Sequence, residues 1–211
     1  MAQNGGMDKY DVKVALKALY SPSAKEFSRV TVPPMQYLAV DGHGDPNTSP
    51  VYADAVEALY SVGYAVKFDS KNAQGRDFVV GPLEGLWRAD DPSVFTTRDK
   101  GAWEWTMLIS QPEWVTGEMV ARAVDRVRVK KPGSTLDSVR FLRLDEGDSV
   151  QILHLGSYDD EAPTLAKLHD EYLPAHGLTF NGDHHEIYLS DPRRIEPARL
   201  KTVLRQPVRP V

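Results

Sequence analysis

Apolar residues recur along the chain with helical spacing in some segments and with the alternation of strands in others. Residues 8–20 place apolar side chains three and four positions apart, which predicts an amphipathic helix. The same spacing follows Thr116, a residue type that caps helices, and predicts a helix within residues 113–131. A third helix is expected to begin at Pro50, because proline fits the first helical turn, and to end near Gly63.

Several segments between these helices are predicted to be extended. They are residues 30–40, 64–68, 77–80, 103–110, 139–144, 150–155 and 185–189. Residues 139–144 and 150–155 flank a short polar turn, so we expect them to pair as a hairpin. A helix is expected after Gly156, capped by Asp159 or Asp160. Residues 81–87 are punctuated by glycine and proline, and a short helix over residues 197–204 is expected near the C-terminus.

The two halves of the chain show the same order of elements. Each contains a strand, a polar turn, a helix started by proline and further strands. Neither half is large enough to be stable alone, and no linker separates them, so they are expected to pack together. This predicts a single α+β domain over residues 1–211. Its parts are two pseudo-equivalent βαββ modules at about 28–111 and 138–208, a connecting helix at about 113–131 and an N-terminal helix at about 8–20.

Composition excludes several classes of function. The 211 residues contain no cysteine, so a disulfide, a thiolate metal site and a cysteine nucleophile are impossible. The net charge of −5 argues against a nucleic-acid partner. No apolar run approaches the ~20 residues of a membrane span, and the N-terminus lacks the apolar core of a signal peptide. We therefore expect a cytoplasmic protein without a membrane partner.

Cofactor and metal motifs are also missing. The chain has no Gly-x-Gly-x-x-Gly, no phosphate-binding loop and no Gly-x-Ser-x-Gly, so no cofactor is expected. His184, His185 and Glu186 make a weak metal motif, because adjacent residues of a strand point to opposite faces. Residues 41–47 are similar to a calcium loop, but Tyr52 stands where that loop needs a glutamate. No metal is therefore predicted.

The strand near residue 187 is the strongest candidate for chemistry. Alternation places Glu186, Tyr188 and Ser190 on one face and the residues between them on the opposite, core face. A carboxylate beside aromatic walls is harder to ionise, which suits general acid–base work. The same spacing also fits an edge strand with a solvated glutamate.

Four tryptophans gather in one stretch of the chain. They are Trp87, Trp103, Trp105 and Trp114. Such a group is able to line a slot for a flat aromatic ligand, and Glu84 would contribute if its loop folded over that slot. The alternative interpretation is a core rich in tryptophan.

Short motifs along the chain resemble the GyrI-like small-molecule-binding family. They are Tyr37–Asn47, Pro82–Trp87, His154–Tyr158, His184–Arg194 and Leu200–Pro207. The resemblance covers about residues 8–208 and implies two SHS2-type, SOUL-like βαββ modules, whose antiparallel sheets are packed by helices around a central ligand groove. It agrees with the internal repeat. The chain departs from the family's transcription regulators, because no DNA-binding helix-turn-helix fits before Tyr37.

The tryptophan-rich, stand-alone form resembles in particular the GyrI-like cyclopropanoid hydrolases. These enzymes add water to the strained spirocyclopropane of DNA-alkylating compounds. The resemblance implies a hydrophobic aromatic small molecule as partner, a role in detoxification and drug resistance, and a monomer or homodimer without cofactor. It places Glu186 at the family's groove carboxylate.

On this hypothesis Glu186 deprotonates water, and Tyr188 or Tyr158 donates to the ligand oxygen on which charge develops. The other candidate ligand-binding residues are Trp87, Trp103, Trp105, Tyr52, Glu84 and His154. Two further functions stay open. One is a non-catalytic drug-binding module with Glu186 as counter-ion in an aromatic cage, and the other is a protein that contacts gyrase. No feature of the sequence separates enzyme from binder.

Overall fold

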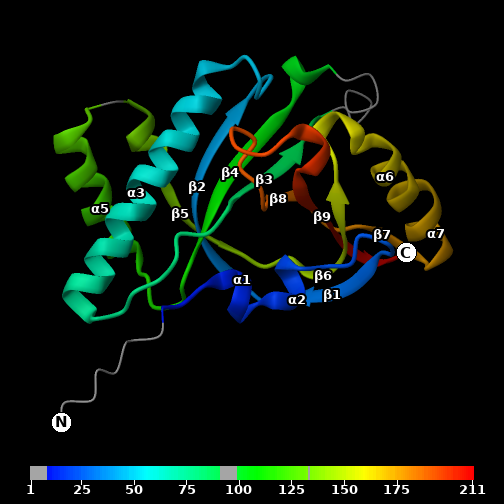
Figure 1. Ribbon diagram of the computed structural model, residues 1–211, viewed down its shortest axis with the longest axis horizontal. Helices are drawn as coiled ribbons and strands as arrows, with labels where there is room; N and C mark the ends of the chain where they lie inside the picture. The colour runs from blue at the N-terminus through cyan, green and yellow to red at the C-terminus, as the bar shows by residue number, and fades with distance from the viewer. Residues whose placement is uncertain (1–8, 91–98, 133) are drawn as a thin grey trace, which may run out of the picture.

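The computed structural model describes residues 9–90, 99–132 and 134–211, which form one large antiparallel sheet with helices on both faces (Figure 1). The strand order is β1-β6-β9-β8-β3-β4-β2-β5, and β7 pairs with β9. The strands are β1 (Ser28–Val32), β2 (Met35–His43), β3 (Leu83–Arg88), β4 (Glu104–Gln111), β5 (Arg140–Leu144), β6 (Gly147–Leu155), β7 (Leu178–Phe180), β8 (His184–Tyr188) and β9 (Lys201–Pro210). The expected α+β class is confirmed, and the division into two pseudo-equivalent modules stays a prediction.

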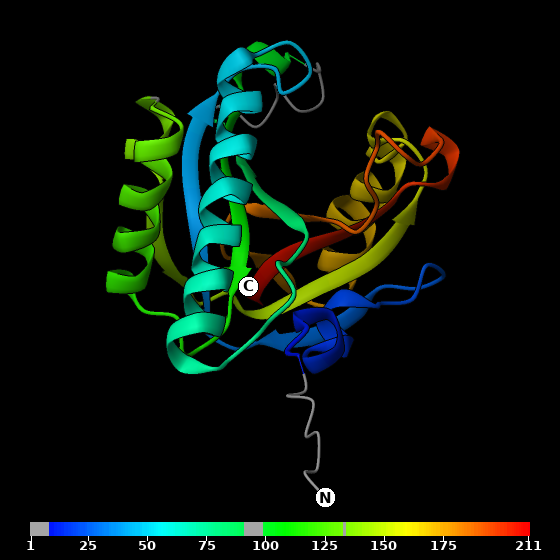
Figure 2. The same cartoon turned by 60° about the vertical axis from the view of Figure 1, so that its left-hand side comes forward.

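Helices cover the two faces unequally. The α-helices are α1 (Val12–Ala15), α2 (Lys17–Tyr20), α3 (Pro50–Gln74), α5 (Gly117–Lys130), α6 (Ala162–Ala166) and α7 (Leu173–Ala175). A π-helical turn, η4 (Lys167–Tyr172), joins α6 to α7, and the 3₁₀ turns are η1 (Lys100–Ala102), η2 (Ser134–Ser138), η3 (Tyr158–Asp160) and η5 (Pro197–Arg199). Figure 2 shows α3 and α5 over one half of the sheet and α6 over the other. No described helix is long and apolar enough to cross a membrane.

Buried apolar residues form three clusters. Two lie on opposite faces of the central strands, and the third joins η4 and α7 to β6 and β9. On the front face, α3 and α5 pack on residues such as Leu38, Trp105 and Met107. On the back face, α1 and α2 pack on residues that include Ile187 and Val203. Alternation along β3, β4 and β8 separates the two sets, so each strand contributes to both cores. Polar side chains near the middle of these strands, such as Glu84 and His185, are therefore buried between the sheet and one of its covering layers.

The predicted hairpin of residues 139–144 and 150–155 is wrong. β5 pairs with β2, whereas β6 pairs with β1 and β9. The registers Val32↔Gly147 and Met35↔Leu144 show that the chain bends, and does not reverse, between β5 and β6. The chain also bends between β1 and β2, opposite the bend between β5 and β6. At this point the pair β1 and β6 adjoins the pair β2 and β5, which lie at opposite ends of the strand order.

The prediction that the Pro50 helix ends near Gly63 is also wrong. The helix α3 continues to Gln74, and residues 64–68 are helical instead of extended. Gly63 is buried inside α3, where an added Cβ would meet Val80 and Leu38 at ordinary contact distances, and it does not end the helix. The helix ends at Gly75, whose φ of 68° is the left-handed conformation of a helix C-terminus.

Four smaller expectations need correction. The helix over residues 197–204 is only η5, because β9 begins at Lys201 and pairs with both β6 and β8. The N-terminal helix is broken at Leu16 into α1 and α2. Residues 81–87 contain most of β3, and residues 77–80 form only an isolated bridge to Tyr10. The predicted cap is confirmed, since Thr116 Oγ1 accepts a hydrogen bond from the Met119 amide.

Candidate functional site

Glu186 lies at the centre of the sheet, on the face that α3 and α6 cover. Its strand β8 runs between β3 and β9, and Glu186 is directly opposite Gly85 in the register. The Tyr188 hydroxyl donates a hydrogen bond of 2.8 Å to Glu186 Oε2, and His184 Nε2 lies 3.6 Å from Oε1. The predicted sharing of one face by Glu186 and Tyr188 is therefore confirmed. The Glu186 side chain is 14% exposed, so it keeps a path to solvent.

The surroundings of Glu186 make its carboxyl hard to ionise. Burial raises the pKa of Glu186 to about 7, although the hydrogen bond from Tyr188 and the charge of His185 act in the opposite direction. A carboxyl with a pKa near neutrality is able to accept a proton and release it again under ordinary conditions. Glu186 is thus suited to general base chemistry.

A short hydrogen-bonded chain holds this carboxyl in place. Trp87 Nε1 donates to the Tyr188 hydroxyl over 2.9 Å, and that hydroxyl in turn donates to Glu186. Gly85 makes room for the chain, because a Cβ there would lie 3.0 Å from Trp87 Nε1 and 3.2 Å from Tyr188 Oη. Since the Tyr188 proton points to Glu186, Tyr188 orients the carboxyl and has no second proton to give.

Aromatic rings surround the carboxyl. Trp103 packs edge-on against Trp87 at 5.6 Å, and Tyr158 packs in the same way against Tyr188 at 5.5 Å. Tyr52 of α3 lies near enough for the Glu186 charge to raise its pKa, after the larger effect of burial. These rings leave one face lined by flat, largely apolar surfaces.

The two remaining tryptophans have other positions. Trp105 is fully buried, donates to the Gly44 carbonyl over 3.3 Å and supports Tyr52 edge-on at 5.2 Å. Trp114 packs against Tyr10 at 5.4 Å, and its Nε1 donates to the Ser70 hydroxyl. The four tryptophans therefore do not share one slot: Trp87 contacts Trp103 and is directly opposite Trp105 in the register, whereas Trp114 packs at Tyr10.

Glu84 lies on the opposite face of the sheet from Glu186. It is directly opposite Ile187 in the register, it is fully buried, and its Oε1 accepts a hydrogen bond of 2.8 Å from the Tyr20 hydroxyl. Its Oε2 forms an ion pair of 3.0 Å with His185 Nε2. Glu84 therefore does not reach the aromatic face, because side chains alternate along β3 and that of Glu84 points to the back face.

His185 belongs to a buried charge network on this back face. Its Nδ1 lies 2.9 Å from Glu146 Oε1, and Arg205 Nη1 donates to Glu146 Oε2 over 3.2 Å. Burial alone would lower the pKa of His185, but Glu146 and Glu84 outweigh it and raise that pKa to about 9. Two carboxylates and two cations balance each other within the network.

His154 is buried on β6, two strands away from Tyr188. Its Nε2 donates to the Ser157 carbonyl over 3.1 Å, which ties β6 to the start of η3, where Tyr158 lies. Thr202 of β9 lies between them in the register, opposite both Tyr188 and His154. His154 therefore shares the face of Glu186, and it contacts the segment that carries Tyr158.

Sequence reasoning missed Glu161, the residue at the start of α6. Asp159 and Asp160, the expected caps, are exposed, whereas Glu161 is 5% exposed. Burial and the charge of Glu186 raise the pKa of Glu161 to about 10. A helical spacing of three residues from Tyr158, which puts both on one side of the turn, is the signal that would have found it.

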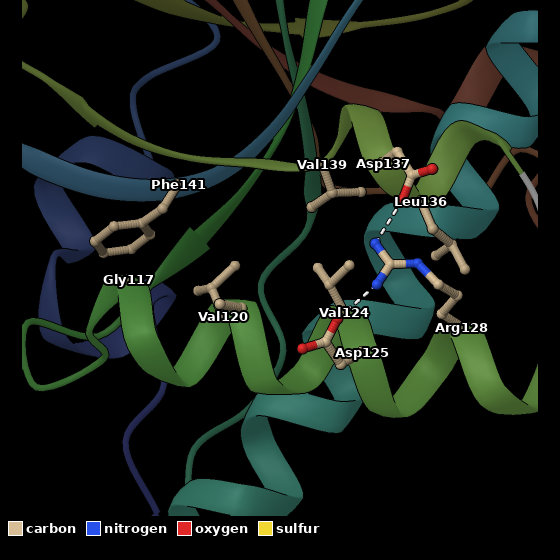
Figure 3. Close-up of a pocket in the computed structure, with 10 residues that line it drawn as sticks. Gly117, Val120, Val124, Asp125, Arg128, Leu136, Asp137, Val139 and Phe141 are labelled. Atoms are coloured by element: carbon tan, nitrogen blue, oxygen red, sulfur yellow. Dashed lines mark hydrogen bonds and ion pairs between the residues drawn. The ribbon is translucent and has the colours of Figure 1, made fainter.

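Neither of two hollows found elsewhere on the surface is lined by these residues. One, of about 310 Å³, lies between α5 and residues 136–141. Figure 3 shows Arg128 of α5 held between Asp125 and Asp137 at its edge. The other, of about 230 Å³, lies beside Glu146 on the back of the sheet. Within the described residues, no group of three or more histidines and carboxylates is placed to hold a metal ion.

The central strands of the sheet therefore carry a carboxyl bordered by aromatic rings, a combination of a polar group and flat walls that is typical of small-molecule sites. The chain belongs to the GyrI-like family, since the family model described as the GyrI-like small molecule binding domain matches residues 25–209. No curated protein matches the chain.

Three solved structures illustrate the likeness. An uncharacterized conserved protein from Listeria innocua is 39% identical with a TM-score of 0.87. A hydrolase from Listeria innocua is 37% identical with a TM-score of 0.86. In both cases 95% of this chain and 100% of the other chain are covered. The EcmrR C-terminal domain shares only the fold, at 11% identity and a TM-score of 0.56 over 88% of this chain and 98% of that chain.

Proposed function

We propose that this protein binds a flat, hydrophobic aromatic electrophile against the Glu186 face and opens a strained cyclopropane in it by adding water. The observation that carries this proposal is a carboxyl with a pKa near 7, oriented by Tyr188 and bordered by aromatic rings. Such a site supplies a base and flat walls together, which is what a neutral, planar substrate requires. The 37% identity with a protein described as a hydrolase supports the hypothesis that this protein is an enzyme.

The chemistry follows from where charge develops. In a spirocyclopropane fused to a cyclohexadienone, water attacks the cyclopropane carbon and the breaking carbon–carbon bond sends its electron pair to the ligand oxygen. Glu186 removes a proton from the attacking water, and the oxygen becomes a phenolate. Stabilising this charge needs a hydrogen-bond donor on the far side of the ligand.

Tyr158 is better suited than Tyr188 to face that oxygen. The Tyr188 proton is already donated to Glu186, whereas Tyr158 lies at the mouth of the site and is 37% exposed. Burial and the charges of Glu161 and Glu186 raise the pKa of Tyr158 to about 12, so it stays protonated and donates. Trp87 and Trp103 would stack along the ligand, with Tyr52 opposite.

The test is mass spectrometry of a spirocyclopropyl dienone incubated with a small amount of protein in ¹⁸O-labelled water. We expect many equivalents of product to carry one labelled oxygen. Glu186→Gln keeps the shape of the side chain and removes the base, so turnover should fall by roughly 10²–10⁴-fold. Full turnover in that variant would exclude Glu186 as the base.

A matched control is Glu171→Gln, which makes the same change at an exposed position of η4. It should leave turnover unchanged. Retention of the compound at one equivalent per protein, without labelled product, would instead establish a binding module. The search would then move to cationic aromatic ligands, for which Glu186 serves as counter-ion.

A further inference from the structure

Glu161 carries a buried carboxyl oxygen to which no described residue donates a hydrogen bond. The side chain is 5% exposed, and its Oε1 has no hydrogen-bond partner among the described residues. A buried carboxylate without a partner is costly, so such a group is either protonated or meets a ligand. A pKa raised to about 10 means that Glu161 is a carboxylic acid at neutral pH, with a proton to give.

The position of Glu161 relates it directly to Glu186. Thr202 of β9 lies beside the Glu161 carboxyl and is opposite Tyr188 in the register. Side chains opposite each other on paired strands have their Cβ atoms about 4.5–5.5 Å apart, so Thr202 adjoins Tyr188. Glu161, which lies beside Thr202, is therefore one strand away from Tyr188. Tyr158, three residues earlier, places its ring on Tyr188. Glu161 therefore approaches from the helix side the space that Glu186 approaches from the sheet.

We propose that Glu161 is a second catalytic carboxyl, which donates the proton that the ligand oxygen acquires when the ring opens. This assignment rests on the proposed hydrolysis. The nearby tyrosines are less suited to full proton transfer, since the Tyr188 proton is held by Glu186 and the pKa of Tyr158 lies near 12. Tyr158 donates a hydrogen bond to the same oxygen, and Glu161 supplies the proton.

The protons balance in this scheme. Water loses one proton to Glu186 as its oxygen bonds to the cyclopropane carbon, and the cleaved carbon–carbon bond leaves its electron pair on the ligand oxygen. Glu161 protonates that oxygen to give a phenol and becomes a carboxylate. A proton then passes from Glu186 to Glu161 through solvent, which restores the starting state.

The experiment compares Glu161→Gln with the wild type on two spirocyclopropyl dienones, one giving an ordinary phenol and one giving a more acidic phenol. The acidic product needs less help from a proton donor. We expect Glu161→Gln to slow the first substrate by roughly 10²–10³-fold and the second much less. The decline in kcat/KM at alkaline pH should also disappear in Glu161→Gln, and Glu171→Gln serves as the control at an exposed site.

The outcomes separate this proposal from the one on which it rests. Equal losses on both substrates, with the alkaline decline retained, would mean that Glu161 only supports the fold and would overturn its role as acid. Full activity of Glu161→Gln would do the same and leave the hydrolase intact. No turnover by the wild type on either compound would overturn the hydrolase itself and this assignment with it.

Discussion

Glu84 and Glu186 lie on paired strands, within one register position of each other, yet on opposite faces of the sheet. Glu84 has Tyr20 and His185 as partners, in a network whose charges cancel. Among the residues that the structure describes, Glu186 has a neutral phenol within hydrogen-bond distance and a histidine at 3.6 Å. The same residue type is therefore structural on the back face and chemically poised on the front face.

Glu186→Gln should be more stable than the wild type at alkaline pH, and this difference should grow as the pH rises. The pKa of Glu186 is about 7 when folded against 4.5 as its ordinary value, so the unfolded chain loses its proton first. Between these values folding becomes less favourable as the pH rises, and this penalty is complete above pH 7. Glu186→Gln avoids it and should gain about 1–3 kcal/mol in unfolding free energy at pH 8, with no gain below pH 4. Urea unfolding at both pH values measures this, and a gain independent of pH would contradict it.

Glu146→Gln should destabilise the protein strongly. The change leaves His185 and Arg205 as buried cations facing one fewer carboxylate, and a buried pair broken in this way typically costs about 3–5 kcal/mol. Although burial opposes ionisation, His185 and Arg205 lower the pKa of Glu146 to about 2. The contribution of Glu146 is therefore present above pH 4.5 and is lost as the pH falls towards 2.

Urea unfolding at pH 6 tests this, with Asp148→Asn as the control. Asp148 lies two residues away, where its ion pair with Arg29 is exposed on both sides. Asp148→Asn should therefore change the unfolding midpoint little. If the unfolding midpoint of Glu146→Gln also stayed close to that of the wild type, the back-face network would contribute nothing to stability.

Local patterns predicted the part of the site that lies within one strand. The alternation of side chains along β8 is a property of the backbone, so Glu186 and Tyr188 could be assigned to one face and Ile187 to the core without any knowledge of neighbouring strands. The Thr116 cap is local in the same sense. Both predictions are confirmed.

Features that depend on distant segments could not be predicted. The polar turn at Asp145 has the composition of a hairpin, but β5 and β6 find better partners in β2 and β9. Gly63 has the composition of a helix end, but the helix continues because this part of α3 packs on distant residues such as Leu38. The spacing from Tyr158 could have placed Glu161 on the same side of the turn, but its burial depends on the sheet beneath it and could not be predicted.

Tyr188→Phe should move the pH dependence of activity. The change removes the hydrogen bond that lowers the pKa of Glu186, so that pKa rises and the carboxylate forms only at higher pH. A hydrogen bond to a charged group contributes about 1.5–3 kcal/mol, so kcat/KM at pH 7 should fall roughly 10–100-fold. The acid limb of the profile should shift to higher pH. Tyr64→Phe, at a position 50% exposed on α3, should leave the profile unchanged, and an unshifted limb in Tyr188→Phe would mean that this hydrogen bond does not set the pKa.

Gly85→Ala should impair the site more than the fold. The new Cβ would lie 2.2 Å from Met107 Cε, a flexible end that is able to move, but also 3.0 Å from Trp87 Nε1 and 3.2 Å from Tyr188 Oη. The hydrogen bond between these two rings has to lengthen, and Glu186 loses its fixed orientation. We expect turnover to fall at least ~10-fold, with a loss of about 1–2 kcal/mol in unfolding free energy.

Gly63→Ala is the matched control, because the same methyl group there meets Val80 and Leu38 at ordinary contact distances of 3.5 and 3.7 Å. Alanine is favoured over glycine inside a helix by about 0.5–1 kcal/mol, so this variant should be at least as stable as the wild type and fully active. Turnover and unfolding measured side by side then separate geometry from stability. If Gly85→Ala kept full turnover, the chain from Trp87 through Tyr188 to Glu186 would not be what orients the carboxyl.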